Sequence, residues 1–224
     1  MLPRSKLSKT RKHFMCLYLL AEKELFSLTA PHRREDDPWA APVSKKTRLA
    51  EDAEDILEGS SEHVDEHDQT ESAQKMAAMR ALIQECESPE DIQTALGRNM
   101  LPPFHRAALH LKDVGGRGYT FEFRHFQASL DPEVIEHFVR LCVALLISAK
   151  SLGEPGRPSF DEMYDAFSKI KEWKNLLKTI GLQHTISFWG KLLSTYPAAP
   201  GGSNSDSSSS EGDGRPSSFL PPLE

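Results

Sequence analysis

The spacing of apolar residues between residues 159 and 181 constrains the fold of this chain more than any other sequence feature. In SFDEMYDAFSKIKEWKNLLKTIG, apolar side chains recur mostly three or four residues apart, which places them on one face of a helix. They are Phe160, Met163, Tyr164, Phe167, Ile170, Trp173, Leu177 and Ile180. Ser159 and Glu162 have the capping-box spacing at its start, and Gly181 ends it. The pattern predicts one long amphipathic helix packed on a core.

Four further segments have helical signals. Residues 71–88 are rich in helix formers, with Met76, Met79, Ile83 and Cys86 on one face. Residues 88–97 begin with Ser88 as N-cap and Pro89 at the first helical position. Residues 131–153 begin with Asp131 and Pro132, and their apolar residues cover more than one face, which predicts a helix buried in the middle of the core. Residues 186–193 predict a last short helix.

One segment has the period of a strand instead. Tyr119, Phe121 and Phe123 alternate with polar residues, and GGRG before them supplies turn residues. LHLKDV, residues 109–114, can pair with this strand as the other arm. We therefore expect one β-hairpin within a mainly α-helical domain.

Composition sets the expected limits of that domain. Residues 51–71 carry ten acids and no Lys or Arg, whereas residues 1–50 carry eleven Lys and Arg against five acids. Segments with dense charge and few apolar residues do not bury enough surface to fold. We predict a basic arm with a short amphipathic helix (1–29), a disordered basic-then-acidic linker (30–70), a helical core domain (71–195) and a disordered Ser/Pro/acidic tail (196–224). The fold class is mainly α, flanked by disordered N- and C-terminal segments.

Basic pairs in the predicted linker resemble a bipartite nuclear import signal. Arg33 and Arg34 are followed, after ten intervening residues, by Lys45, Lys46 and Arg48. An accessible, extended segment of this kind fits an import receptor, and a plain solvated arm is the alternative. The spacing predicts a protein of nucleus and cytoplasm.

The tail carries two candidate regulatory features. Ser203, Ser208 and Ser210 each precede an acid by three residues, a spacing that acidophilic kinases favour. FLPPLE places Phe219, Leu220 and Leu223 beside prolines, a form typical of short partner-binding segments. The alternatives are an unmodified solubilising tail and a chance string.

Catalytic and metal sites are not indicated. His63 to His67 match H-x-x-E-H, but they lie in the acidic linker, where nothing would keep a metal site dry. The histidines from His105 onward, and Cys142 on an apolar helix, lack a catalytic context and are expected in ordinary core or surface positions. The three cysteines are widely spaced and predict no disulfide framework. No cofactor is implied, and no segment has the roughly 20 apolar residues of a membrane span.

Three functions of different classes remain. The first is a non-enzymatic intracellular regulatory or adaptor protein that docks partner proteins through its helical core and charged, modifiable arms. The second is a nucleic-acid-associated structural or regulatory protein, for instance a viral one, that uses the basic N-terminal arm with Arg4, Lys6, Lys9, Arg11 and Lys12. The third is an enzyme with an unrecognised site. The sequence favours the first and leaves the partner and the oligomeric state open.

Overall fold

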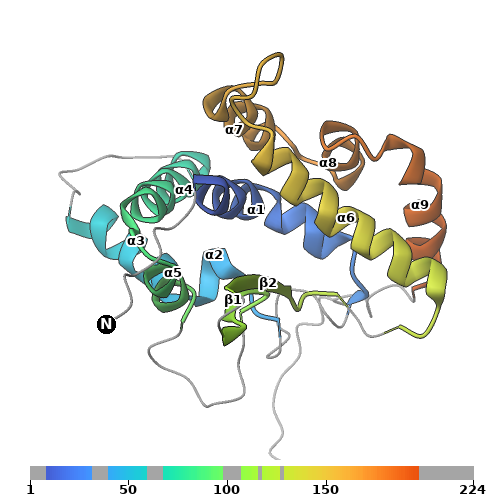
Figure 1. The fold of residues 1–224 in the computed structure, drawn as a ribbon, viewed down its shortest axis with the longest axis horizontal. Coiled ribbons are helices and arrows are strands. Elements are labelled where there is room, and N and C mark those ends of the chain that lie inside the picture. The colour runs from blue at the N-terminus through green and yellow to red at the C-terminus, as the bar shows by residue number, and fades with distance from the viewer. Residues whose placement is uncertain are drawn as a thin grey trace, which may run out of the picture.

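Figure 1 shows a computed structural model of the chain, which describes residues 9–31, 40–59, 68–97, 107–115, 118–126 and 129–196. The helices are α1 (Lys9–Ser27), α2 (Val43–Lys46), α3 (Arg48–Gly59), α4 (Asp68–Glu85), α5 (Pro89–Ala95), α6 (Pro132–Lys150), α7 (Phe160–Ser168), α8 (Trp173–Thr179), the 3-10 helix η3 (Gln183–Thr185) and α9 (Ile186–Thr195). The strands are β1 (Leu109–Asp113) and β2 (Tyr119–Phe123). Within these residues the fold is mainly α with one hairpin, as the sequence predicts.

The hairpin is antiparallel and joins the two predicted arms, β1 and β2. Leu109 pairs with Phe123 and Leu111 with Phe121, so one face of apolar side chains turns toward the helices. Gly115 and Gly118 adopt φ values of 71° and 95°, a left-handed conformation that favours glycine, and they turn the chain between the strands. The hairpin prediction is confirmed.

Helix α1 is the centre of the molecule, and it contacts α4, α6, α7 and α8 (Figure 1). Every side chain from His13 to Leu19 is buried. The predicted basic arm with a short amphipathic helix is therefore corrected, because from Lys9 onward this segment is a 19-residue helix within the core. Because FMCLYLL is apolar on all sides, the helix that contains it must lie inside a core.

The predicted disordered linker is also wrong over residues 43–59. Helices α2 and α3 occupy this segment, and Val43, Leu49, Ala50 and Ala53 join the main core. The small apolar residues of α3 share one face, so α3 packs on α4 even though most of its other side chains are charged. The core thus extends well before residue 71, and the domain boundary predicted there does not hold.

Helix α6 does not lie in the middle of the core, which corrects a further prediction. Its inner face, with Val134, Leu141, Leu145 and Ala149, is buried. Its outer face is exposed and nevertheless apolar. Because α1 already occupies the centre, α6 covers α1 from one side only (Figure 1).

The long helix predicted for residues 159–181 is divided into α7 and α8. The intervening turn has a hydrogen bond from the Ile170 N–H to the Phe167 carbonyl, and both side chains are buried. The bend keeps Leu176, Leu177 and Ile180 against the same core. The predicted caps are confirmed at all three helix starts, Ser88 for α5, Asp131 for α6 and Ser159 for α7.

Candidate functional site

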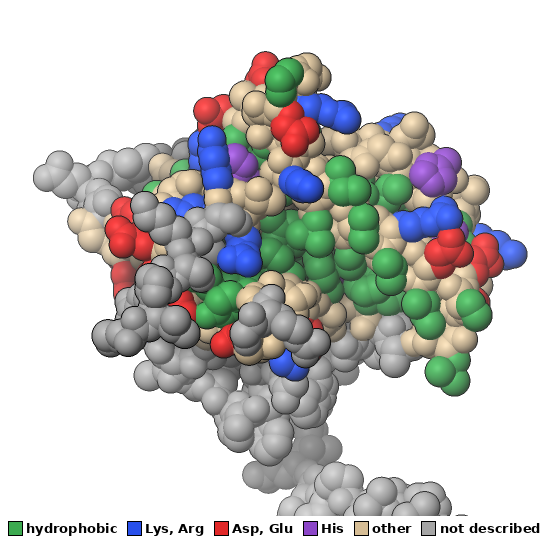
Figure 2. Space-filling view, viewed as in Figure 1, with side chains coloured by type: hydrophobic (Ala, Val, Ile, Leu, Met, Phe, Trp, Pro, Cys, Tyr) green, Lys and Arg blue, Asp and Glu red, His purple; other side chains and the backbone are tan. Residues whose placement is uncertain are grey.

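The most prominent surface feature is a row of apolar side chains on α6. Ile135, Val139, Val143 and Ile147 follow one another at intervals of four residues and are 45%, 52%, 45% and 58% exposed. We call these four residues the α6 ridge. Figure 2 shows hydrophobic side chains gathered over and beside α6 on this face of the molecule.

The ridge is flanked by two different borders. On the hairpin side, the half-buried residues Phe138, Cys142 and Leu146 extend the apolar surface toward β2, since Phe138 contacts Phe123 edge to face with ring centroids 6.5 Å apart. On the other side, the Arg140 guanidinium pairs with the Glu136 carboxylate one turn away. The site is therefore an apolar strip with a polar, charge-balanced edge.

The rest of the fold holds α6 in a fixed position. Asp131 accepts a hydrogen bond of 2.9 Å from the Glu133 N–H and so caps the first turn. Phe126 stacks on Phe138 with ring centroids 4.4 Å apart, and Phe188 of α9 stacks on His137 at 3.7 Å. Because these contacts anchor the inner face along several elements, the ridge is presented on a rigid support.

Burial shifts the pKa values of two titratable groups on α6, His137 and Cys142. Burial, and then the neighbouring Arg140, lower the pKa of His137. Burial raises the pKa of the Cys142 thiol to about 12, and that of Cys16 also to about 12. A thiol of this kind is protonated at neutral pH and is a poor nucleophile. Cys16 is buried in the core, whereas Cys142 is only half-buried at the border of the ridge, which corrects the core position that the sequence predicts for it.

The histidines of the described segments that have ring partners lie among aromatic side chains. His13 stacks on Phe160 at 4.3 Å, and His125 lies beside Tyr18, Phe26, Phe123 and Phe138. Across the segments that the structure covers, no three His, Cys, Asp or Glu side chains gather in a way that would hold a metal ion. His63, His67 and His105 lie outside the described residues.

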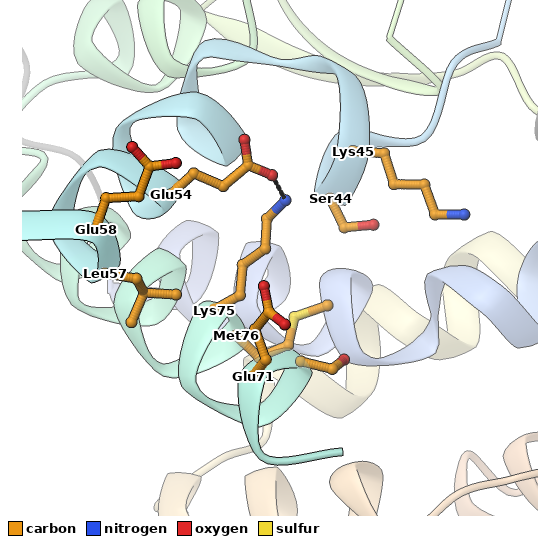
Figure 3. Close-up of a pocket in the computed structure, with 9 residues that line it drawn as sticks. Ser44, Lys45, Glu54, Leu57, Glu58, Glu71, Lys75 and Met76 are labelled. Atoms are coloured by element: carbon orange, nitrogen blue, oxygen red, sulfur yellow. Dashed lines mark hydrogen bonds and ion pairs between the residues drawn. The ribbon is translucent and has the colours of Figure 1, made fainter. Parts of the chain in front are cut away.

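A cleft of about 350 Å³ lies between α2, α3 and α4. Figure 3 shows Lys75 paired with Glu54 across it, with Glu58 and Glu71 at its edge and Lys45 on the α2 side. Glu54, Glu58 and Glu71 are exposed to solvent. Charged side chains and the apolar Leu57 and Met76 line the cleft, and none of the described polar side chains that line it is buried.

The predicted import residues are only partly described. Lys45 and Lys46 end α2 and Arg48 begins α3, and all three side chains are exposed. They lie on two short helices and not in an extended linker. Arg33 and Arg34 lie outside the described residues, as do Ser203, Ser208, Ser210, Phe219, Leu220 and Leu223 of the tail.

Sequence reasoning did not identify the α6 ridge. The apolar residues around more than one face of α6 were visible, but the same pattern is typical of a helix in the middle of a core. The signal that distinguishes a central α6 from a peripheral one lies in α1. Its run FMCLYLL is apolar on every side, so α1 fills the centre of the core and α6 lies outside it.

Comparison with known proteins gave no relatives, because no family model, no curated protein and no solved structure matches this chain. The helices in the described part of the chain include none with both the length and the apolar character needed to cross a membrane.

Proposed function

We propose that this chain is a non-enzymatic regulatory or adaptor protein that docks proteins through the α6 ridge and carries charged, modifiable arms. The observation that supports docking best is the exposure of four consecutive ridge residues, each near half. Scattered exposed apolar residues are ordinary on protein surfaces, but a contiguous apolar strip with a polar edge is typical of an interaction site.

The energetics of the ridge favour a bound partner. Fully burying a Val or Ile side chain contributes about 1.5–3 kcal/mol of free energy. Burying the exposed half of each ridge residue against a partner would therefore contribute about 1 kcal/mol to binding. Valine and isoleucine are branched at Cβ and hold nearly one rotamer in a helix, so little side-chain entropy is lost on binding. The ridge is thus prepared for contact with another apolar surface.

The nucleic-acid alternative has less support. Of the basic cluster at the N-terminus, Lys12 donates a hydrogen bond to the Gln84 carbonyl, and the Arg11 guanidinium lies 5.7 Å from the centre of the Tyr119 ring. These side chains take part in contacts within the fold. A basic surface that binds phosphates would have them directed outward.

Action in nucleus and cytoplasm is part of the proposal. The exposure of Lys45, Lys46 and Arg48 is compatible with receptor binding, and the predicted phosphorylation and tail-docking residues remain predictions. Changing Lys45, Lys46 and Arg48 together to alanine should shift a fluorescently tagged full-length chain toward the cytoplasm. An unchanged distribution would contradict the import signal without affecting the docking surface.

Docking is tested by chemical cross-linking in cells, read by mass spectrometry. The full-length chain is compared with Val139→Glu/Val143→Glu, and Ile56→Glu is the matched control because Ile56 is also 45% exposed but lies on α3. We expect cross-links from the α6 region to other protein chains, including further copies of this one, to disappear in the double variant and persist in the control. The same cross-links in all three proteins would contradict α6 as the docking surface.

A further inference from the structure

We infer that the α6 ridge binds a second copy of this chain, with the two α6 helices antiparallel across a two-fold axis that passes between Val139 and Val143. This inference rests on the proposed function, since it takes α6 as the docking surface and specifies its occupant. It is argued from three properties of the ridge: its symmetry, its geometry and the charges at its ends.

The ridge has the symmetry that a two-fold interface requires. In such an interface residue i contacts residue j of the second copy, and j contacts i. Ile135 and Ile147 lie equally far from Leu141 along the sequence, as do Val139 and Val143. An antiparallel pairing therefore places isoleucine opposite isoleucine and valine opposite valine. Leu130 and Leu152, beyond the two helix ends, are also at mirrored positions.

The spacing of the ridge matches a common mode of helix packing. Residues four apart form one continuous ridge on a helix surface, and two helices that interdigitate such ridges cross at about −50° in the commonest packing class. Val139 and Val143 lie at the middle of the exposed face and would form the centre of the contact, with Ile135 and Ile147 at its margins. The side-chain row Phe138, Cys142 and Leu146 borders the groove that receives the opposite ridge.

The charges at the two helix ends favour the antiparallel orientation. Asp131 and Glu133 are exposed at the start of α6, and Lys150 is exposed at its end. Position 150 mirrors position 132, between the two acids, so an antiparallel encounter brings opposite charges toward each other and aligns the helix dipoles favourably. The intrachain pair of Glu136 and Arg140 leaves the edge of the ridge without net charge, so it does not repel a second copy.

A competing occupant is the apolar segment of the tail with Phe219, Leu220 and Leu223. Its sequence FLPPLE has two adjacent prolines, which are incompatible with a helix interior and so with a matching ridge at four-residue intervals. Binding of a tail segment would also not require the ridge residues to be mirror-symmetric. A second copy of the chain explains both the four-residue spacing and the mirror symmetry of the ridge.

The test uses the full-length chain in sedimentation velocity and a pair of charge variants. The first variant is Val139→Glu/Val143→Glu and the second is Val139→Lys/Val143→Lys. In the inferred pairing, position 139 faces position 143 of the other copy. Two copies of the same variant therefore repel each other, whereas a copy with two Glu attracts a copy with two Lys. Circular dichroism of both variants checks that they fold, which is expected because both positions are about half exposed.

The expected result is a wild-type species of twice the 25.1 kDa chain mass, monomers for each variant alone, and recovery of the double-mass species on mixing. We expect the mixed pair to associate about tenfold or more tightly than either variant with itself. Ile56→Glu should sediment as the wild type does.

Three results would overturn the inference. The first is a wild-type chain that stays monomeric at all concentrations, and the second is charge variants that remain dimeric. The third is a monomer that dimerises only when Phe219, Leu220 and Leu223 are changed to serine, which would assign the ridge to the tail. The chain could be monomeric while its α6 cross-links to other proteins are still lost in the Glu variant. That result would support the proposed docking function and contradict only the binding of a second copy.

Discussion

At the scale of single residues, Glu22 joins two helices that are distant in the sequence. Its carboxylate on α1 accepts hydrogen bonds from the N–H groups of Val43, at 2.6 Å, and Ser44, at 2.9 Å, at the start of α2. Burial raises the pKa of Glu22, although these donors oppose the shift. No local pattern predicts this role, because the partners follow 21 and 22 residues later and the surrounding EKE is typical of a solvent-exposed stretch.

The raised pKa of Glu22 predicts a pH-dependent contribution to stability. Because the folded-state pKa lies above the unfolded value near 4.5, the folded chain takes up a proton more readily. The favourable contribution is therefore complete below about pH 4.5 and is lost as the pH rises through the folded-state pKa. We expect the difference in unfolding free energy between wild type and Glu22→Gln, measured by urea denaturation, to become less favourable to the wild type from pH 4.5 toward neutrality.

The control for this prediction is Glu51→Gln, an exposed acid on α3. The pH-dependent change should be larger for Glu22→Gln than for this control, because only the Glu22 carboxyl is removed from water. A pH-independent difference for Glu22→Gln would show that the carboxyl of Glu22 has the same pKa in both states.

At the scale of elements, local signals were sufficient for some helices and not for others. Ser88, Asp131 and Ser159 were recognisable as caps because each cap contacts backbone within three residues. The turn between α7 and α8 has no Pro or Gly, so its sequence continues the helical pattern while packing on the core bends the chain. Likewise α3 is charged on most of its surface, and only its small apolar face, which depends on α4 for burial, makes it a stable helix.

Arg80 connects α4 to α7 and gives a prediction at this scale. Its guanidinium lies 4.8 Å from the centre of the Phe160 ring and 4.4 Å from that of Tyr164, and it pairs with Asp161 at 2.6 Å. Arg80→Ala should lower the unfolding free energy by about 1–2 kcal/mol, mainly through loss of the cation–π contacts. Arg80→Lys should retain only part of this unfolding free energy, because an ammonium group lacks the planar stacking surface of a guanidinium.

Urea denaturation measures both variants, and Arg140→Ala is a matched control. Arg140 has an exposed salt bridge within one helix, which contributes about 0.3–0.5 kcal/mol. Equal losses for Arg80→Ala and Arg140→Ala would contradict a special role for the junction of α4 and α7.

At the scale of the whole molecule, the core is continuous from α1 to α9. Phe14 and Leu17 near the start of the described residues belong to the same cluster as Leu176 and Trp189 near the end. The sequence predicted a domain over residues 71–195, because that is where helical periodicity is clearest. It could not place α1, since the run FMCLYLL within α1 is apolar all round and has no preferred face, so its partners are set only by the tertiary fold.

The central position of α1 predicts that residues 71–195 do not fold alone. Removing α1 exposes the inner face of α6 and deletes fully buried side chains that include Phe14 and Tyr18, each of which contributes about 3 kcal/mol or more. We expect this fragment to unfold without cooperativity in urea, followed by circular dichroism. Residues 9–196 serve as the comparison and should unfold in one transition. A cooperative transition for the shorter fragment would contradict the assignment of α1 to the core.

The central claim, that the α6 ridge is an interface with a second copy of the chain, is tested most directly by site-specific photo-cross-linking of the full-length protein. A benzophenone side chain replaces Ile147 at the margin of the ridge, and the same side chain at Ile56 is the control. Mass spectrometry then locates the bond. With the benzophenone at position 147, we expect a covalent dimer whose new bond lies near Ile135 of the second copy. With the benzophenone at position 56, we expect no covalent dimer. A chain that remains uncross-linked at position 147, or that links no more than at position 56, would contradict it.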